Sequence, residues 1–241
     1  MTPRAPGHPP GARPTAVVSA MGPGRGKLTE RAYVYIRNGI LRGELPVGSA
    51  LAEGELAAAL GISRTPVRHA LGLLLQEGLC EIGPRRQLLV RGFTSEHRTE
   101  LLALREALES VAVRRACEVM TMDDVDHLRL LLLRQRRAAD DVREDDFIDL
   151  DEEFHVRIAE SARLPILVGF LGQLRGFVRV ARLGTVRHPS HLAQVIDEHE
   201  AIVDALEKRD AASALEALSE HLHTSDYVLH ERPAAREKVS R

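Results

Sequence analysis

Four side chains in the second half of the sequence have the types and spacing to bind a divalent metal ion. Asp151 and His155, in LDEEFHVRIAE, are four residues apart and share one face of a helix, so both can reach the same ion. His199 in IDEHEAIVDAL and His221 in SEHLHTS follow, each beside apolar positions. Three imidazoles and one carboxylate suit Zn²⁺ or another borderline divalent metal and leave a position for water or a ligand oxygen. Because these segments are far apart in the sequence, histidines in partly buried hydrogen bonds remain the alternative from spacing alone.

A second stretch, GISRTPVRHALGLLLQEGL at residues 61–79, has one apolar and one polar side. On a helical wheel the polar side presents Thr65, Arg68 and His69, whereas the other side is an apolar seam. The seam consists of Val67, Ala70, Leu71 and Leu74. The leucines are therefore expected to anchor the helix on a protein core.

The start of this helix has the features of an anion-binding end. Free amide groups at a helix N-terminus favour phosphate, and Arg64 and Arg68 can add a contact to phosphate or guanine. Ser63 or Thr65 is expected to cap the remaining amide groups. The alternative is an ordinary amphipathic helix with a solvated arginine face.

Short elements around residues 61–79 would position this helix. A helical stripe runs from Leu28 to Leu41, a second helix ends at Gly61, and a tight turn leads into the third, which ends at Gly78. The segments LCEI and LLVRGF then flank the turn GPRRQ, a pattern that predicts a β-hairpin wing.

Residues 28–94 resemble the winged helix-turn-helix domain of the GntR family of bacterial transcription regulators. The matching segments are IRNGILRGELPVGSAL, GISRTPVRHAL and LLQEGL, followed by the wing. The resemblance implies a double-stranded DNA operator as partner, and the family's base and phosphate contacts map onto Ser63, Arg64, Thr65 and Arg68.

Three positions depart from the family pattern. Gly54 stands where the family often has a DNA-contacting arginine, and His69 stands where it usually has glutamate. At the wing tip, Arg85 and Arg86 replace the common glycine. We expect His69, Arg85 and Arg86 to contact the duplex as well, so the operator sequence need not match that of better-known members.

Beyond Thr94 the sequence predicts helices alone. Apolar positions recur at spacings of three and four residues in six segments separated by short breaks. These are 96–118, 122–142, 144–162, 165–184, 190–208 and 210–230. The fold class is therefore mostly α, a winged helix-turn-helix followed by an antiparallel bundle of about six to seven helices.

Residues 96–230 resemble the FCD-type helical effector domain of the FadR branch of the GntR family, through LREALES, DEEFHVRIAE and EHEAIVDALEKRDAASALEALSEHL. The resemblance implies a metal bound by Asp151, His155, His199 and His221, with Zn²⁺ as the first choice and Ni²⁺ or Mn²⁺ as alternatives. It also implies that Arg105 binds a small carboxylate effector, for which its guanidinium fork is suited. A salt bridge from Arg105 to Glu109 is the alternative.

Charge and composition agree with a nucleic-acid partner for the first part of the chain. Residues 1–94 carry 12 Lys and Arg against 6 Asp and Glu, and residues 95–241 carry 21 against 29. A basic first part favours a polyanion, which would repel an acidic second part. The two isolated cysteines, the lack of a membrane-length apolar run and the lack of a signal-peptide core predict a soluble cytoplasmic protein.

These patterns lead to one organisation and one function. We expect a disordered tail at 1–26, a DNA-binding domain at 27–94, a ligand- and metal-binding dimerisation domain at 95–231, and a flexible tail at 232–241. The predicted function is a homodimeric, ligand-responsive regulator, a repressor, on a two-fold symmetric operator. The alternatives are a metal-dependent hydrolytic enzyme that uses the Asp and three His, and an architectural DNA-binding protein without an effector.

Overall fold

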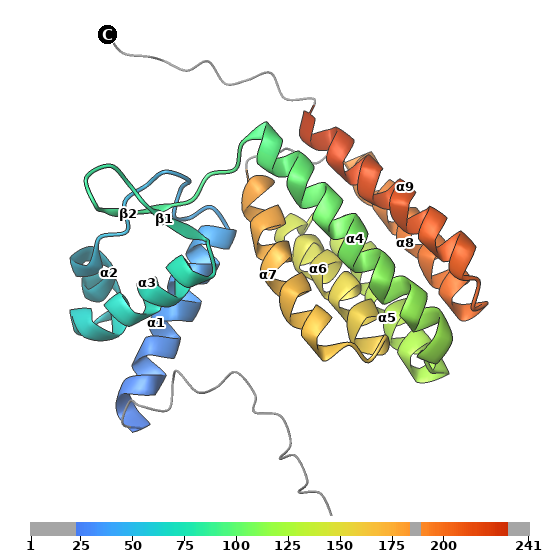
Figure 1. Ribbon diagram of the computed structural model, residues 1–241, viewed down its shortest axis with the longest axis horizontal. Coiled ribbons are helices and arrows are strands. Elements are labelled where there is room, and N and C mark those ends of the chain that lie inside the picture. Colours follow the sequence, from blue (N-terminus) through green and yellow to red (C-terminus); the bar gives the residue numbers. More distant parts are fainter. Residues whose placement is uncertain (1–22, 184–188, 231–241) are drawn as a thin grey trace, which may run out of the picture. The chain divides into compact units, whose positions relative to one another are not determined.

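Residues 23–183 and 189–230 are described by the computed structural model, and they divide into two units. The first unit contains the described residues up to Gly39 and Ser49–Val90; the second contains Ile40–Gly48 and the described residues from Arg91 onward. Helices dominate both, so the predicted class, a winged helix-turn-helix and a helical bundle, is confirmed (Figure 1).

Three helices build the first unit: α1 (Pro23–Leu41), α2 (Glu53–Leu60) and α3 (Arg64–Gln76). The chain turns between α2 and α3 at Gly61, whose φ of 65° is left-handed and disfavours any residue with a Cβ. The apolar seam predicted for α3 is buried, and α2 packs against α3. This packing leaves the opposite face of α3 to solvent.

The wing follows α3 as an antiparallel pair, β1 (Cys80–Ile82) and β2 (Leu88–Val90). Ala50 forms a further antiparallel bridge to Leu89, which ties the wing to the segment before α2.

The wing turn contains a strained position. The Gly83 amide donates to the Gln87 carbonyl at 2.8 Å, and the Arg86 amide donates to the Gly83 carbonyl at 2.9 Å. Arg86 has a φ of 60°, in the left-handed region that glycine adopts most easily. The wing thus keeps the expected turn although an arginine stands at its tip.

The predicted terminal tails fall largely outside the described residues. Residues 1–22 and 231–241 are not described, but α1 begins at Pro23, inside the stretch 1–26 that the sequence pattern assigns to a tail. Proline is well tolerated in the first helical turn, so a segment without apolar periodicity can still start a helix.

Six helices build the described part of the second unit, at nearly the predicted positions. They are α4 (Ser95–Val119), α5 (Met122–Asp140), α6 (Glu144–Ser161), α7 (Pro165–Ala181), α8 (Pro189–Glu207) and α9 (Ala211–His230). Thr94 and Thr121 begin α4 and α5 with reciprocal capping boxes, in which the third residue of the helix bonds back to the cap.

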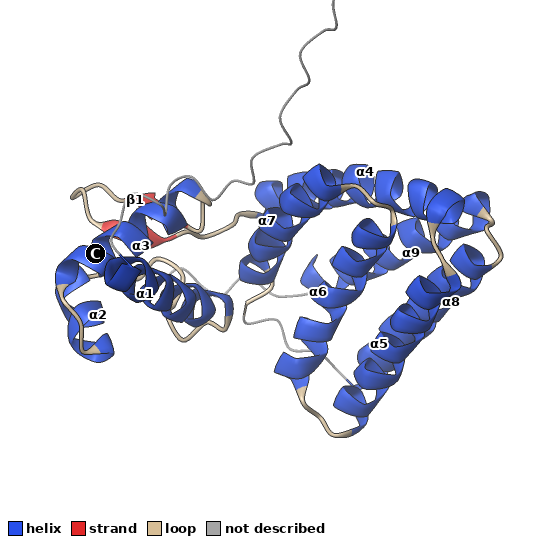
Figure 2. Cartoon of the chain, turned by 90° about the horizontal axis from the view of Figure 1, so that it is seen from below, coloured by secondary structure: helices blue, strands red, loops and turns tan. Residues whose placement is uncertain are grey.

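The six helices close into a ring in which each contacts its two neighbours, in the order α4, α9, α8, α5, α6 and α7. α4 also contacts α6 and α8 across the ring, and Figure 2 shows the same helices from below. Most of their buried apolar side chains form one core, and Leu101 of α4 with Leu174 and Val178 of α7 forms a smaller separate cluster. Side chains from all six helices therefore meet along the middle of this unit.

None of the described helices is long and apolar enough to cross a membrane.

Candidate functional site

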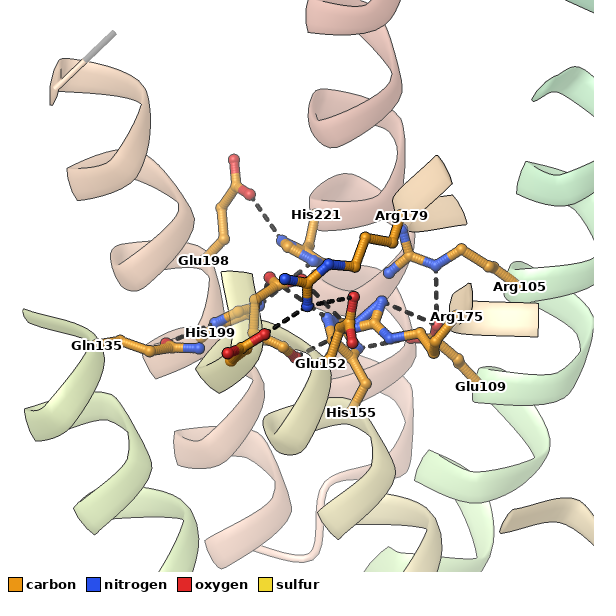
Figure 3. Close-up of polar contacts among 12 residues, drawn as sticks. Arg105, Glu109, Gln135, Glu152, His155, Arg175, Arg179, Glu198, His199 and His221 are labelled. Atoms are coloured by element: carbon orange, nitrogen blue, oxygen red, sulfur yellow. Dashed lines mark hydrogen bonds and ion pairs between the residues drawn. The ribbon is translucent and has the colours of Figure 1, made fainter. Parts of the chain in front are cut away.

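Asp151, His155, His199 and His221 converge inside the helical unit. Asp151 and His155 come from α6, His199 from α8 and His221 from α9, and each of the four residues is at most 5% exposed. One ligand atom from each residue lies within 4.8 Å of the others. Figure 3 shows the three imidazoles pointing toward one another.

The distances among these atoms suit a shared ion. The Nε2 atoms of His199 and His221 are 3.3 Å apart, and Asp151 Oδ1 lies 3.6 Å from His199 Nε2 and 3.9 Å from His155 Nε2. Two ligands each ~2.1 Å from one ion at a tetrahedral angle are about 3.4 Å apart.

The outer nitrogen of each histidine is held by a second residue. His199 Nδ1 donates to Gln135 Oε1 of α5 at 3.0 Å, and His221 Nδ1 donates to Glu198 Oε2 of α8 at 2.9 Å. Such contacts fix the proton on Nδ1 and leave Nε2 free to bind a metal.

The third histidine, His155, lies close to Glu109, but the angle between the two groups does not suit a hydrogen bond. His155 Nδ1 lies 2.6 Å from Glu109 Oε2 of α4, an ion-pair distance, although neither atom meets the geometry of a hydrogen bond. His155 Nε2 is buried and has no hydrogen-bond partner among the described residues. A buried nitrogen left unpartnered beside a carboxylate and two imidazoles is what a missing cation would explain, so these residues fit a divalent metal.

Two buried arginines complete the centre. Arg105 Nε donates to Glu109 Oε1 at 2.9 Å, which is the salt bridge that the sequence left as an alternative. Arg175 of α7 donates through Nη2 to the backbone carbonyl of Asp151 at 2.9 Å and to its Oδ2 at 3.3 Å. The Nη2 atom of Arg105 is buried without a hydrogen-bond partner among the described residues, so one edge of this guanidinium is not used.

Burial sets the protonation of the candidate ligands. It lowers the pKa of His199 to about 3 and also lowers the pKa values of His155 and His221. For Asp151, burial acts to raise the pKa, but the neighbouring positive charges, Arg175 foremost, together outweigh it and hold the pKa well below the usual value. The centre thus holds neutral imidazoles and a charged carboxylate near neutral pH, the forms that bind metals.

A cavity of about 180 Å³ adjoins this centre, and its lining includes Asp151 and Arg175 together with Glu152 and Arg179. Asp151 and Arg175 therefore connect the buried centre to a space that could admit a small molecule.

Sequence reasoning missed Gln135, Arg175 and Glu198. Gln135 continues the buried stripe of Leu128, Leu131 and Leu132 on α5, and Arg175 lies on the buried side of α7 with Leu171 and Leu174. A polar residue on a core-facing stripe was the available signal, because such a residue needs a partner inside.

The predicted DNA-contacting residues are all exposed in the first unit. Five lie at the start of α3 and two at the wing tip: Ser63, Arg64, Thr65, Arg68, His69, Arg85 and Arg86. The Ser63 side chain makes no capping hydrogen bond, so the capping predicted for it is wrong. Arg68 pairs with Glu53 of α2 through two hydrogen bonds.

Two family models match the chain. The FCD domain matches residues 100–224, and the model described as "Bacterial regulatory proteins, gntR family" matches residues 28–90. Both ranges fall on the elements described above, the helical ring and the winged helix-turn-helix.

Individual relatives match over most of their length. The transcriptional repressor RspR of Escherichia coli is 28% identical over 81% of this chain and 86% of its own. An uncharacterised transcriptional regulator of Streptomyces ambofaciens is 34% identical, and the match covers 79% of this chain and 80% of that protein. The solved structure of E. coli McbR/YncC has a TM-score of 0.75 at 25% identity and covers 84% of this chain and 96% of its own. These relatives are transcription regulators, not enzymes, and the hydrolytic alternative finds no support among them.

Replacing His199 or His221 by alanine is expected to weaken metal binding by more than ~100-fold, since each change removes a ligand and not merely its supporting contact. The melting temperature of these variants in the presence of metal should also fall below that of the wild type, because the ion stabilises only the folded state. Metal analysis after dialysis and thermal unfolding with and without a chelator measure both. His223→Ala, exposed on the same helix α9, is the matched control. Stoichiometric metal in both ligand variants would contradict the assignment.

Gln135→Leu tests the supporting contacts. Leucine fills a similar volume but leaves His199 Nδ1 without its acceptor, so we expect metal affinity to drop about 10- to 100-fold. Competition with a chromophoric chelator measures the affinity. Gln76→Leu, a similar change on the exposed surface of α3 in the first unit, serves as control. Equal affinities for the two variants would mean that Gln135 does not support the site.

Proposed function

Since the chain belongs to the GntR family of bacterial regulatory proteins and carries an FCD domain, we propose that it is a ligand-responsive transcription repressor. Its first unit binds a DNA operator, and its helical unit senses a small carboxylate through a bound divalent metal. The observation that carries the sensing role is the buried set of Asp151 and three histidines with their supporting residues. Repression is supported by the name of one relative, the repressor RspR.

The charge of the centre favours an anionic effector. The guanidinium groups of Arg105 and Arg175 balance the carboxylates of Glu109 and Asp151, and the imidazoles are neutral. A bound divalent ion, Zn²⁺ by donor set with Ni²⁺ or Mn²⁺ as alternatives, would supply a Lewis-acidic position for a ligand oxygen. It would also add two positive charges, and each carboxylate of an effector can neutralise one of them. The Nη2 atom of Arg105, buried without a hydrogen-bond partner among the described residues, is a donor that such a group could use.

The operator contacts come from α3 and the wing. Arg64, Arg68 and His69 are exposed on the first two turns of α3, and free amide groups at this N-terminus favour phosphate. Because one such helix contacts few base pairs, we infer a two-fold symmetric operator bound by a homodimer.

Two neighbouring helices of the second unit have exposed apolar stripes suited to the dimer. Leu104 and Val111, seven residues apart on α4, are 44% and 52% exposed, and Ile166 and Phe170, four apart on α7, are 78% and 61% exposed. Dimerisation is typical of this family, and a second copy of the chain is the occupant that we propose for these stripes. The protein acts where the chromosome is, in the cytoplasm.

Arg64→Ala and Arg68→Ala should each weaken operator binding. Both side chains are exposed on α3, so the protein should remain folded. A lost guanine contact costs about 1–3 kcal/mol and relaxes specificity at one base pair, whereas a lost phosphate contact weakens all sequences alike. Titration of a duplex selected by the wild-type protein from a randomised library measures this. Arg137→Ala, exposed on α5, is the control. Unchanged affinities for both α3 variants would refute the DNA contacts.

Phe170→Glu should convert the dimer to a monomer. Each dimer would lose two buried phenylalanine contacts, each worth ~1.5–3 kcal/mol, which weakens association at least about 100-fold. Light scattering across a concentration series reports the mass. Leu130→Glu, on the exposed side of α5, should leave the dimer intact. A wild-type protein that is monomeric throughout would rule the proposal out.

Arg105→Lys should retain the metal and lose most of the effector response. Lysine keeps a positive charge beside Glu109 but lacks the second nitrogen of the fork. The measurement has two steps: a thermal-shift screen of small mono- and dicarboxylic acids on metal-loaded protein, then release of the selected duplex by the acids that stabilise it. Arg114→Lys is the control. A wild-type response in Arg105→Lys would exclude the sensing role.

A further inference from the structure

Glu53, in the first turn of α2, binds Arg68 through both of its carboxylate oxygens. Arg68 Nε donates to Glu53 Oε1 at 2.8 Å, and Arg68 Nη2 donates to Glu53 Oε2 at 2.7 Å. This two-point pairing fixes the plane of the guanidinium as well as its position. The Arg68 side chain nevertheless remains 66% exposed, so the rest of the group faces solvent.

Arg64 lies against the next residue of the same turn. A Cβ added to Gly54 would come within 3.4 Å of Arg64 Nη2 and 3.6 Å of Arg64 Cζ. These are ordinary contact distances, so the Arg64 guanidinium packs directly beside position 54 and a side chain longer than alanine would compete with it for space. The hydrogen bonds of Arg68, and to a lesser extent the charge of Arg64, lower the pKa of Glu53, so this carboxylate is charged beside both arginines.

The pairing decides which donors of Arg68 remain. A guanidinium has five N–H donors, and Glu53 accepts from Nε and from one N–H of Nη2. The remaining donors lie on Nη1 and on the outer side of Nη2. This end of the fork can still donate two parallel bonds to O6 and N7 of one guanine.

Pairing also changes how Arg68 interacts with the DNA backbone. The Glu53–Arg68 pair has no net charge, so it gains little from phosphate attraction, whereas an unpaired arginine would be drawn to any phosphate. Within the proposed DNA-binding function, on which this inference rests, we propose that Glu53 is a positioning residue that makes Arg68 a guanine-specific contact and prevents it from acting as a phosphate contact.

If Glu53 only stabilised helix α2, Glu55 in the same turn would have the same effect. Glu53 and Glu55 both lie in the first turn of α2, where negative charge is favourable, but the two-point contact to Arg68 is made by Glu53. Glu55 is exposed and carries the same charge on the same turn. Glu55→Gln is therefore a matched control for Glu53→Gln in both net charge and helix stability.

The test compares these variants on defined DNA. The probes are the duplex that wild-type, full-length protein selects from a randomised library, its single base-pair variants, and an unrelated duplex of equal length. We expect Glu53→Gln to lose about tenfold discrimination at one G·C pair, the size of one bidentate guanine contact. Its binding to the unrelated duplex should tighten, and the salt dependence there should steepen by up to about one ion, because Arg68 is then free to bind phosphate. Glu55→Gln should retain the wild-type discrimination.

A double-mutant cycle shows whether Glu53 acts through Arg68. In an Arg68→Ala background, adding Glu53→Gln should cause no further loss of discrimination at that base pair. Equal melting temperatures for Glu53→Gln and Glu55→Gln exclude unfolding as the cause. The proposal is overturned if Glu53→Gln discriminates like wild type, if both Gln variants change alike, or if Glu53→Gln strengthens binding to every duplex equally. If the wild-type protein itself discriminates among no duplexes, it is the DNA-binding function that fails.

Discussion

Burial of charged and polar groups at the centre of the helical ring is the constraint on which the second unit depends. The group consists of Arg105, Glu109, Gln135, Asp151, His155, Arg175, His199 and His221, all buried and drawn from all six helices. An unpaired charge in such surroundings would cost several kcal/mol, so each of these groups needs a partner from another helix or turn. The helices must therefore pack in one arrangement for the centre to be satisfied.

A ligand that enters this centre would act on several helices at once. Asp151 and His155 belong to α6, whereas His199 belongs to α8 and His221 to α9. The supporting contacts extend the same network to α4 and α5. A change in charge at a metal bound by these residues would thus have a direct physical route to five helices, and differential contacts of this kind are what allow a ligand to shift a conformational equilibrium.

The sequence predicted the parts of the protein that depend on local pattern. The six helices of the second unit follow from apolar periodicity and from breaks such as TMDD, where Thr121 caps α5. The four candidate ligands were found by residue type and by resemblance. Gln135, Arg175 and the pairing of Arg68 with Glu53 were not found, because each depends on a partner distant in sequence that only the packed helices bring near. The start of α1 was missed because its first turn, PGRG, has no apolar residue whose spacing could indicate a helix.

Gly54 has a consequence for how operator preference could change during evolution. A Cβ added at position 54 would lie 3.4 Å from Arg64 Nη2, an ordinary contact, so a longer side chain there would compete with the Arg64 guanidinium for space. An arginine introduced at position 54 would have to share that volume with Arg64, so the effect of the substitution depends on which residue stands at 64. The two positions are therefore epistatic. A new operator preference at this site would therefore be expected to involve changes at both positions.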